Sequence, residues 1–122
     1  MTRTLRALRG ATTLDADTKE QVMDRTGALI AALMERNGLA KEDFVSIIFT
    51  ATDDIRSEFP AAAARGIGIS DVPLLCAREL DVEGAVERCI RVLAHLYTDK
   101  APADLRHVYL EGATPLRTDL PQ

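Results

Sequence analysis

The sequence contains few of the residues on which most enzyme active sites depend. Its two cysteines, Cys76 and Cys89, are thirteen positions apart and form no C-x-x-C pair, a pattern that fits free thiols better than a disulfide framework. The histidines, His95 and His107, lack ligand-like spacing to each other and to the cysteines, which argues against a zinc site. None of the three serines lies in a G-x-S-x-G motif, so a nucleophile elbow is excluded.

Long hydrophobic segments are also missing. The longest apolar run extends from Ala28 to Met34, far short of the about 20 residues that cross a membrane. The basic N-terminal segment is followed by no apolar stretch of the kind found in signal peptides. Gly66 and Gly68 lack the third glycine of a dinucleotide-binding loop. We therefore expect a cytoplasmic protein without a membrane segment or a dinucleotide site.

The residues that are present describe an ordinary globular domain. With 122 residues, 47% hydrophobic and 28% charged, the chain is expected to form a single domain over residues 1–122. The net charge of −4 argues against nucleic acid as a partner, because phosphate binding leaves a basic footprint. Twelve of the 15 basic residues are Arg. Codon preference, which also favours the 18 Ala, accounts for much of this bias, yet Arg is the residue that holds carboxylates through paired hydrogen bonds.

Hydrophobic periodicity predicts strands that alternate with helices. The expected strands are Thr4 to Leu14, Phe44 to Thr52, Val72 to Arg78 at an edge, Arg106 to Glu111 and a short one at Leu116-Arg117. The first expected helix is capped by Asp15 or Asp17, with Glu20 in a capping box, and it ends at Gly38. A short helical turn is expected from Pro60 to Arg65. A second long helix, capped by Asp81, is expected from about Val82 to Tyr97.

This order predicts an α+β fold, with a mixed sheet of about five strands and two long helices on one face. The other face of the sheet would be bare in a monomer. The stretch Val45 to Phe49 is largely apolar on both sides of a strand, which favours burial of that second face by self-association. We therefore expect a homo-oligomer with its site between subunits.

Several stretches, taken together and in order, resemble one known family. They are Arg6-Ala7-Leu8-Arg9-Gly10-Ala11-Thr12-Thr13, Phe49-Thr50-Ala51-Thr52-Asp53-Asp54, Phe59-Pro60-Ala61, Val72-Pro73-Leu74-Leu75-Cys76, Glu79-Leu80-Asp81-Val82, Cys89-Ile90-Arg91-Val92, Arg106-His107-Val108-Tyr109-Leu110-Glu111 and Leu116-Arg117. This set, which spans nearly the whole chain, is similar to the trimeric AroH class of chorismate mutases.

The resemblance implies the rearrangement of chorismate to prephenate in phenylalanine and tyrosine biosynthesis. It also implies a homotrimeric pseudo-α/β barrel with active sites at subunit interfaces. The reaction is a unimolecular pericyclic shift that needs no nucleophile, metal or cofactor, which agrees with the residues that the sequence lacks. A catalyst must instead hold the reactive conformer of a dianion and stabilise the charge that develops as a C–O bond breaks.

The resemblance also implies roles for individual residues. Arg91 would contact the ether oxygen and a carboxylate, Arg9 would bind the side-chain carboxylate with Tyr109, and Glu79 and Cys76 would meet the ring hydroxyl. An apolar wall would consist of Phe59, Ala61, Leu74, Leu75 and Leu116, and Arg65 and Arg117 would lie at the mouth. On the expected second helix Arg91 would point away from the core, so a neighbouring subunit would have to meet it.

The sequence departs from the family pattern at the mouth of the site. Ala62 replaces a common Lys, the segment from Arg65 to Pro73 is one residue short, and the tail after Arg117 (residues 118–122, expected to be flexible) is only a stub. These departures predict weaker substrate capture. Two other interpretations stay open at this stage, namely a non-catalytic trimeric module that binds small carboxylates and a purely structural oligomer.

Overall fold

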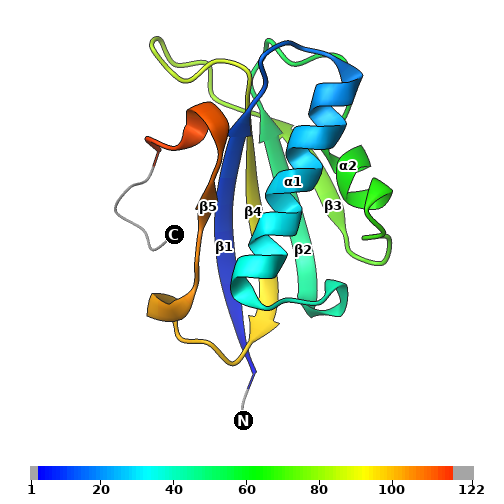
Figure 1. The fold of residues 1–122 in the computed structure, drawn as a ribbon, viewed down its shortest axis with the longest axis vertical. Helices are drawn as coiled ribbons and strands as arrows, with labels where there is room; N and C mark the ends of the chain where they lie inside the picture. Colours follow the sequence, from blue (N-terminus) through cyan, green and yellow to red (C-terminus); the bar gives the residue numbers. More distant parts are fainter. Residues whose placement is uncertain (1–2, 117–122) are drawn as a thin grey trace.

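The computed structural model describes residues 3–116 as a five-stranded mixed sheet with two helices on one face (Figure 1). The spatial order of the strands is β3-β2-β4-β1-β5. In chain order the elements are β1 (Thr4–Thr13), α1 (Lys19–Asn37), β2 (Phe44–Ala51), α2 (Pro60–Gly66), β3 (Leu74–Arg78), β4 (Cys89–Thr98) and β5 (Val108–Tyr109), with short 3₁₀ turns at Lys41–Asp43, Pro102–Asp104 and Glu111–Ala113. The expected α+β class and five-stranded mixed sheet are confirmed.

The expected second long helix is wrong, because most of its residues form the central strand. β4 pairs antiparallel with β1 on one side and with β2 on the other. Along β4 the side chains of Ile90, Val92, Ala94 and Leu96 are buried, and the residues between them face the other side of the sheet. This period of two belongs to a strand. Residues 79–88 are a loop, in which Gly84 has a φ of +81°, a conformation that interrupts any helix.

α1 is the one long helix of the described chain, and its ends differ in detail from expectation. It begins one residue after Thr18, whose side chain accepts a hydrogen bond from the Gln21 amide, so neither Asp15 nor Asp17 is the cap. The Gln21 side chain in turn accepts hydrogen bonds from the Asp15 and Ala16 amides, in the place expected for Glu20. The helix ends at Gly38 in the left-handed conformation, as predicted.

The remaining elements follow the prediction with bounds that differ by a few residues. The turn that begins at Pro60 is the helix α2, and β3 lies at an edge of the sheet. The fifth strand is only the pair Val108–Tyr109. Leu116 lies in a turn instead of a short strand, and Arg117 and the tail 118–122 lie outside the described residues.

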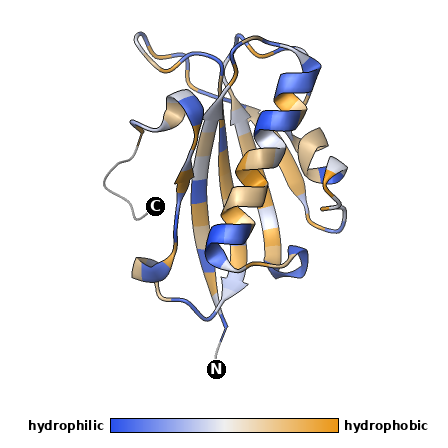
Figure 2. Cartoon of the chain, in the orientation of Figure 1, coloured by the Kyte–Doolittle hydropathy of each residue, from blue (hydrophilic) through white to orange (hydrophobic). Residues whose placement is uncertain are grey.

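The hydrophobic core lies between the sheet and the two helices. Leu29 and Leu33 of α1 and Ala64 of α2 meet Phe49 and Leu96 of the sheet, all of them buried. Hydrophobic residues recur along the strands and along the side of α1 that crosses them (Figure 2). The opposite face of the sheet carries neither helix (Figure 1), and we call it the open face.

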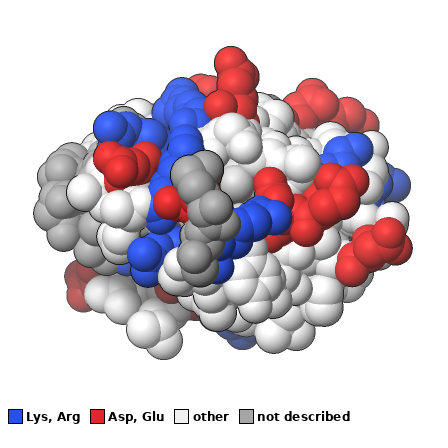
Figure 3. Space-filling model, turned by 90° about the horizontal axis from the view of Figure 1, so that it is seen from below, with Lys and Arg blue, Asp and Glu red and all other residues white. Residues whose placement is uncertain are grey.

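One end of the surface is rich in charges of both signs. At the end of the molecule that carries the N-terminus, Lys and Arg side chains are interspersed with Asp and Glu (Figure 3). Near the start of α1, at the other end of the molecule, Arg25 pairs with Asp15 at 2.8 Å and Lys19 pairs with Glu58 at 3.5 Å. Neither helix within residues 3–116 is long and apolar enough to cross a membrane.

Substitutions at two glycines, Gly10 of β1 and Gly27 of α1, are expected to have opposite effects on stability. A Cβ atom on Gly10 would lie 3.0 Å from Leu29 Cδ1 and 3.1 Å from the Val108 carbonyl oxygen, whereas one on Gly27 would meet Ile67 Cγ2 at an ordinary 3.8 Å. Gly10→Val should therefore lower the free energy of unfolding by about 1–3 kcal/mol through overpacking. Gly27→Ala, inside α1, should raise it by about 0.5–1 kcal/mol. Urea unfolding at one protein concentration measures both, and an unchanged midpoint for Gly10→Val would contradict the close packing of α1 on β1.

Candidate active site

A row of paired residues crosses the open face at one level of the sheet. Thr50 of β2 pairs with Arg91 of β4, Arg91 pairs with Ala11 of β1, and Ala11 pairs with Tyr109 of β5. Paired residues in a sheet point to the same side, so all four share the open face. Ala11 carries only a methyl group between two long side chains, and this leaves a hollow in the row.

Glu79 reaches this row of residues from the end of β3, on the β2 side of Arg91. Its amide donates a hydrogen bond to the Ala51 carbonyl at 2.9 Å, which continues the pairing of β3 with β2. Its Oε2 lies 3.3 Å from Arg91 Nε and accepts a hydrogen bond from Thr50 Oγ1 at 2.7 Å. The contact with Arg91 is close enough for an ion pair, but the N–H does not point at the oxygen, and this buried Nε has no hydrogen-bond partner among residues 3–116. The attraction between the two is therefore electrostatic.

Arg9 lies on the same face, one step diagonally from Arg91. It pairs with Leu93 in β1–β4 register, two residues along from the pair formed by Ala11 and Arg91. Its backbone amide donates to His107 Nδ1 at 2.9 Å, which ties β1 to the segment before β5. Within residues 3–116 its guanidinium forms no ion pair with a carboxylate.

These residues line a cavity of about 370 Å³, which we call the open-face cavity. Its lining includes Arg9, Glu79, Arg91 and Tyr109, with Ile48 and Leu93 as apolar neighbours. Two guanidinium groups and one carboxylate give it a net charge of +1, which favours an anionic ligand. The structure thus brings together four of the residues named from the sequence, on four different strands or strand ends.

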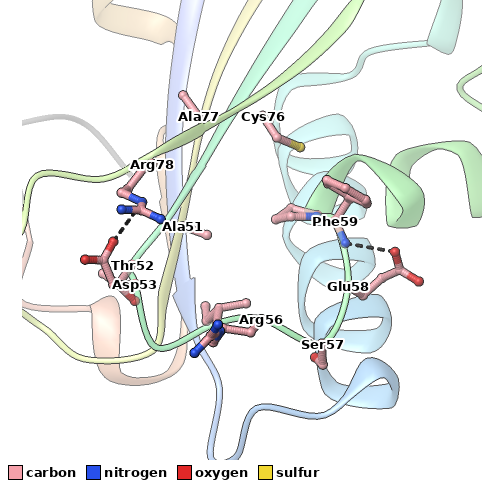
Figure 4. Close-up of a pocket in the computed structure, with 12 residues that line it drawn as sticks. Ala51, Thr52, Asp53, Arg56, Ser57, Glu58, Phe59, Cys76, Ala77 and Arg78 are labelled. Carbon is pink, nitrogen blue, oxygen red and sulfur yellow. Dashed lines mark hydrogen bonds and ion pairs between the residues drawn. The ribbon is translucent and has the colours of Figure 1, made fainter.

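Phe59 and Cys76 line a separate cavity of about 600 Å³ beyond the edge of the sheet (Figure 4). Phe59 is 67% exposed although it is aromatic, and it lies with Cys76 on one side of the cavity. On the other side Arg78 Nε pairs with Asp53 Oδ1 at 3.2 Å. We call this space the edge cavity.

The other residues named from the sequence are dispersed. Ala61 is buried in the core, and Leu74 packs partly buried against the same core. Leu75 is exposed on the open face, where it pairs with Ile48. Arg65 is exposed in the last turn of α2. Leu116 packs partly buried against the small cluster that contains Tyr109 and Ala11.

Two residues of these cavities were not predicted from the sequence. Thr50 holds the Glu79 carboxylate, and the exposed Arg56 lines the edge cavity. The only signal for Thr50 is its place between Phe49 and Ala51, which face the core, so that Thr50 must face the other side. Arg56 lies in a loop whose backbone is held by Asp17, which accepts hydrogen bonds from the Arg56 and Ser57 amides, a contact that no local pattern indicates.

Cys89 lies beneath the open-face cavity, two residues before Arg91 on β4. Burial raises the pKa of the Cys89 thiol, and the Glu79 carboxylate also raises it, against an opposing effect of the Arg91 guanidinium. Because the thiolate is the nucleophile, this thiol is protonated and unreactive at neutral pH. Cys76 is partly exposed in the edge cavity.

Residues 5–120 match the model of one protein family, described as chorismate mutase type I. The chain belongs to this family. It is 47% identical to the chorismate mutase AroH of Thermus thermophilus and 41% identical to that of Bacillus subtilis, over 95% of this chain and 96% and 92% of theirs. The structure matches a chorismate mutase from Clostridium thermocellum with a TM-score of 0.90 and 46% identity, over 91% of this chain and 99% of that one.

The resemblance seen in the sequence is thereby confirmed. The activity is that of a chorismate mutase, an isomerase of aromatic amino acid biosynthesis in the shikimate pathway. Of the interpretations that the sequence left open, the enzyme is the one that these comparisons support. The long second helix was the error, since the strand β4 carries Arg91 onto the open face directly.

The two thiols of this chorismate mutase should react at very different rates. In the native protein at pH 8, a disulfide reagent such as 5,5′-dithiobis(2-nitrobenzoate) should modify Cys76 first. The reason is that Cys89 is buried and its pKa is raised. The Cys76→Ser variant should release little chromophore until it is unfolded, and Cys89→Ser should react as the native protein does. Rapid modification of folded Cys76→Ser would contradict the burial of Cys89.

Proposed function

We propose that this chorismate mutase binds chorismate against the open-face cavity and that a neighbouring subunit of a homotrimer completes the site. The observation that carries the proposal is the convergence of Arg9, Arg91, Glu79 and Tyr109 from separate strands on one hollow of net positive charge. The substrate has two carboxylates, and the cavity offers two guanidinium groups to an anionic ligand.

Arg91 is proposed as the principal catalytic residue. Its Nε lies 3.3 Å from Glu79 Oε2, and within residues 3–116 Glu79 is the one carboxylate with which its guanidinium, with two further Nη nitrogens, forms an ion pair. Those nitrogens are the donors that an oxygen anion needs. As the C–O bond of chorismate breaks, the ether oxygen gains negative charge, and a guanidinium held in place stabilises the transition state more than the ground state. One such donor contributes about 3–4 kcal/mol in comparable sites.

We propose that the Glu79 carboxylate stabilises the positive charge that develops on the ring of chorismate during the reaction. The ring becomes more positive as the ether oxygen becomes more negative, and a fixed carboxylate on the ring side offsets that charge. Arg9 and Tyr109 would bind the side-chain carboxylate from β1 and β5. Together these groups would also hold the reactive conformer, which removes part of the entropic barrier.

The second half of the site is proposed to come from the edge cavity of a neighbouring subunit. Phe59 and Cys76 line that cavity, whereas Arg9 and Arg91 of the same chain line the open-face cavity, so one substrate molecule meets both sets most simply across an interface. The open face supports this, since it exposes Leu5, Leu75 and Tyr97 at 49%, 61% and 46%. Burial of such side chains by a second copy is favourable.

The remaining residues implied by the resemblance have places in the same proposal. Cys76 would meet the ring hydroxyl with Glu79, and Phe59, Leu74, Leu75 and Leu116 would form the apolar wall, backed by Ala61. Arg65 would assist at the mouth, together with Arg117, which lies outside the described residues. The proposed location of the enzyme is the cytoplasm.

Removal of the Arg91 guanidinium should abolish turnover without unfolding the protein. Arg91→Ala should lower kcat/KM at least about 100-fold, equivalent to about 2.7 kcal/mol. Arg91→Lys should also fail, because an ammonium group does not reproduce the fork of two donors. The loss of chorismate absorbance measures activity, and thermal unfolding checks the fold. Arg36→Ala, at the exposed end of α1, is the matched control. Activity of Arg91→Ala within about tenfold of the wild type, which is ~1.4 kcal/mol, would contradict the assignment.

Subunit mixing tests the composite site. Arg91→Ala should inactivate the open-face half, and Phe59→Asp, at an exposed position, should inactivate the edge half by repelling the dianion. Refolding the two variants together in equal amounts should restore about a quarter of the wild-type activity, because a random trimer pairs two intact halves at about one site in four. Sedimentation checks that the mixture is trimeric. A mixture as inactive as its components would show that one chain supplies both halves.

A further inference from the structure

The hydroxyl group of Thr50 makes a contact at the centre of the cavity that the proposed function leaves unused. Thr50 Oγ1 donates a 2.7 Å hydrogen bond to Glu79 Oε2, the same oxygen that lies 3.3 Å from Arg91 Nε. Thr50 is also the residue of β2 that pairs with Arg91 on β4. The hydroxyl therefore meets the carboxylate at the point where the carboxylate meets the guanidinium.

We infer that Thr50 is a positioning residue that holds the Glu79 carboxylate at a fixed angle to Arg91. Arg91 Nε does not donate a hydrogen bond to Glu79, so the 3.3 Å contact between Nε and Oε2 does not set the rotation of the carboxylate. Its two oxygens are held separately: the Leu80 amide donates to Oε1 at 3.2 Å, and Thr50 donates to Oε2. Of these two donors, Thr50 makes the shorter bond, and it lies on β2, which is paired with a strand on each side.

The position itself does not require a hydroxyl for packing. Thr50 lines the open-face cavity on the side of the sheet away from the helices, so a methyl group of the same size would fit there. Thr12 of β1 offers a comparison. It is fully buried on the helix side, and its Oγ1 has no hydrogen-bond partner within residues 3–116. The Thr50 hydroxyl therefore binds a carboxylate, whereas the Thr12 hydroxyl has no such contact in the described part of the chain.

This inference rests on the proposed role of Glu79 in the transition state. A carboxylate that is fixed before the reaction stabilises the developing positive charge without reorganising. A carboxylate that can rotate away loses much of that effect, and small displacements of catalytic groups have large kinetic consequences. The expected result is a lower kcat with little change in KM, because the interaction strengthens only as charge develops.

Thr50→Val removes the donor and keeps the shape of the side chain. Its kcat on chorismate should fall about 10- to 100-fold, and its KM should stay within about threefold. Thr50→Ser restores the hydroxyl and should recover kcat to within about threefold of the wild type. Thr12→Val is the matched control, and both kcat and KM should be unchanged. If Thr50→Val unfolds at a lower temperature than the wild type, Thr50→Ala, which adds no bulk, carries the same expectation.

A double-mutant cycle with Glu79→Gln separates positioning from a general effect on the sheet. If Thr50 acts through the carboxylate, Thr50→Val should change kcat less than about threefold in the Glu79→Gln background. A full effect in that background would overturn the inference, and so would a Thr50→Val enzyme with wild-type kcat beside an impaired Glu79→Gln. A Glu79→Gln enzyme with wild-type kcat would overturn the proposed role of Glu79 and this inference with it.

Discussion

The antiparallel pairing of β4 with both β1 and β2 is the constraint on which the rest of the structure depends. Each ladder fixes the register of β4 independently. The side chains of a strand alternate between its faces, so a slip of one residue would move Arg91 into the core and expose the buried Ile90 and Val92. The hydrophobic core on one face thus secures the position of a charged residue on the other.

Elements with a strong local pattern could be predicted from the sequence, whereas β4 could not. The 3.6-residue stripe of α1 and its Gly38 end are local signals, and β1 and β2 are rich in β-branched or alternating residues. The segment Val82 to Tyr97 has apolar residues at spacings that also suit a helix. Its strand arises from pairing with two distant strands, and this context outweighs local propensity. Gly84 disfavours a helix in this segment, and the structure gives it a positive φ.

In the candidate site, too, some residues could be named from the sequence and others could not. Arg9, Glu79, Arg91 and Tyr109 were named from the family resemblance, and the sheet brings all four to one cavity. Their convergence could not be derived from periodicity, because the expected helix placed Arg91 on a different kind of surface. Thr50 was missed for a related reason. Its hydroxyl meets a carboxylate 29 positions away in the chain, and no pattern within one strand indicates such a contact.

Because Ala11 has a small side chain, the spacing of the strands sets the width of the open-face cavity. Arg91 and Tyr109 stand on the strands at either side of β1, with Ala11 directly between them. Their backbones are therefore two inter-strand spacings apart, about 10 Å, a distance set by main-chain hydrogen bonds and independent of side-chain flexibility. The length of a ligand that Arg91 and Tyr109 can contact at the same time is therefore set by the pairing of β4, β1 and β5.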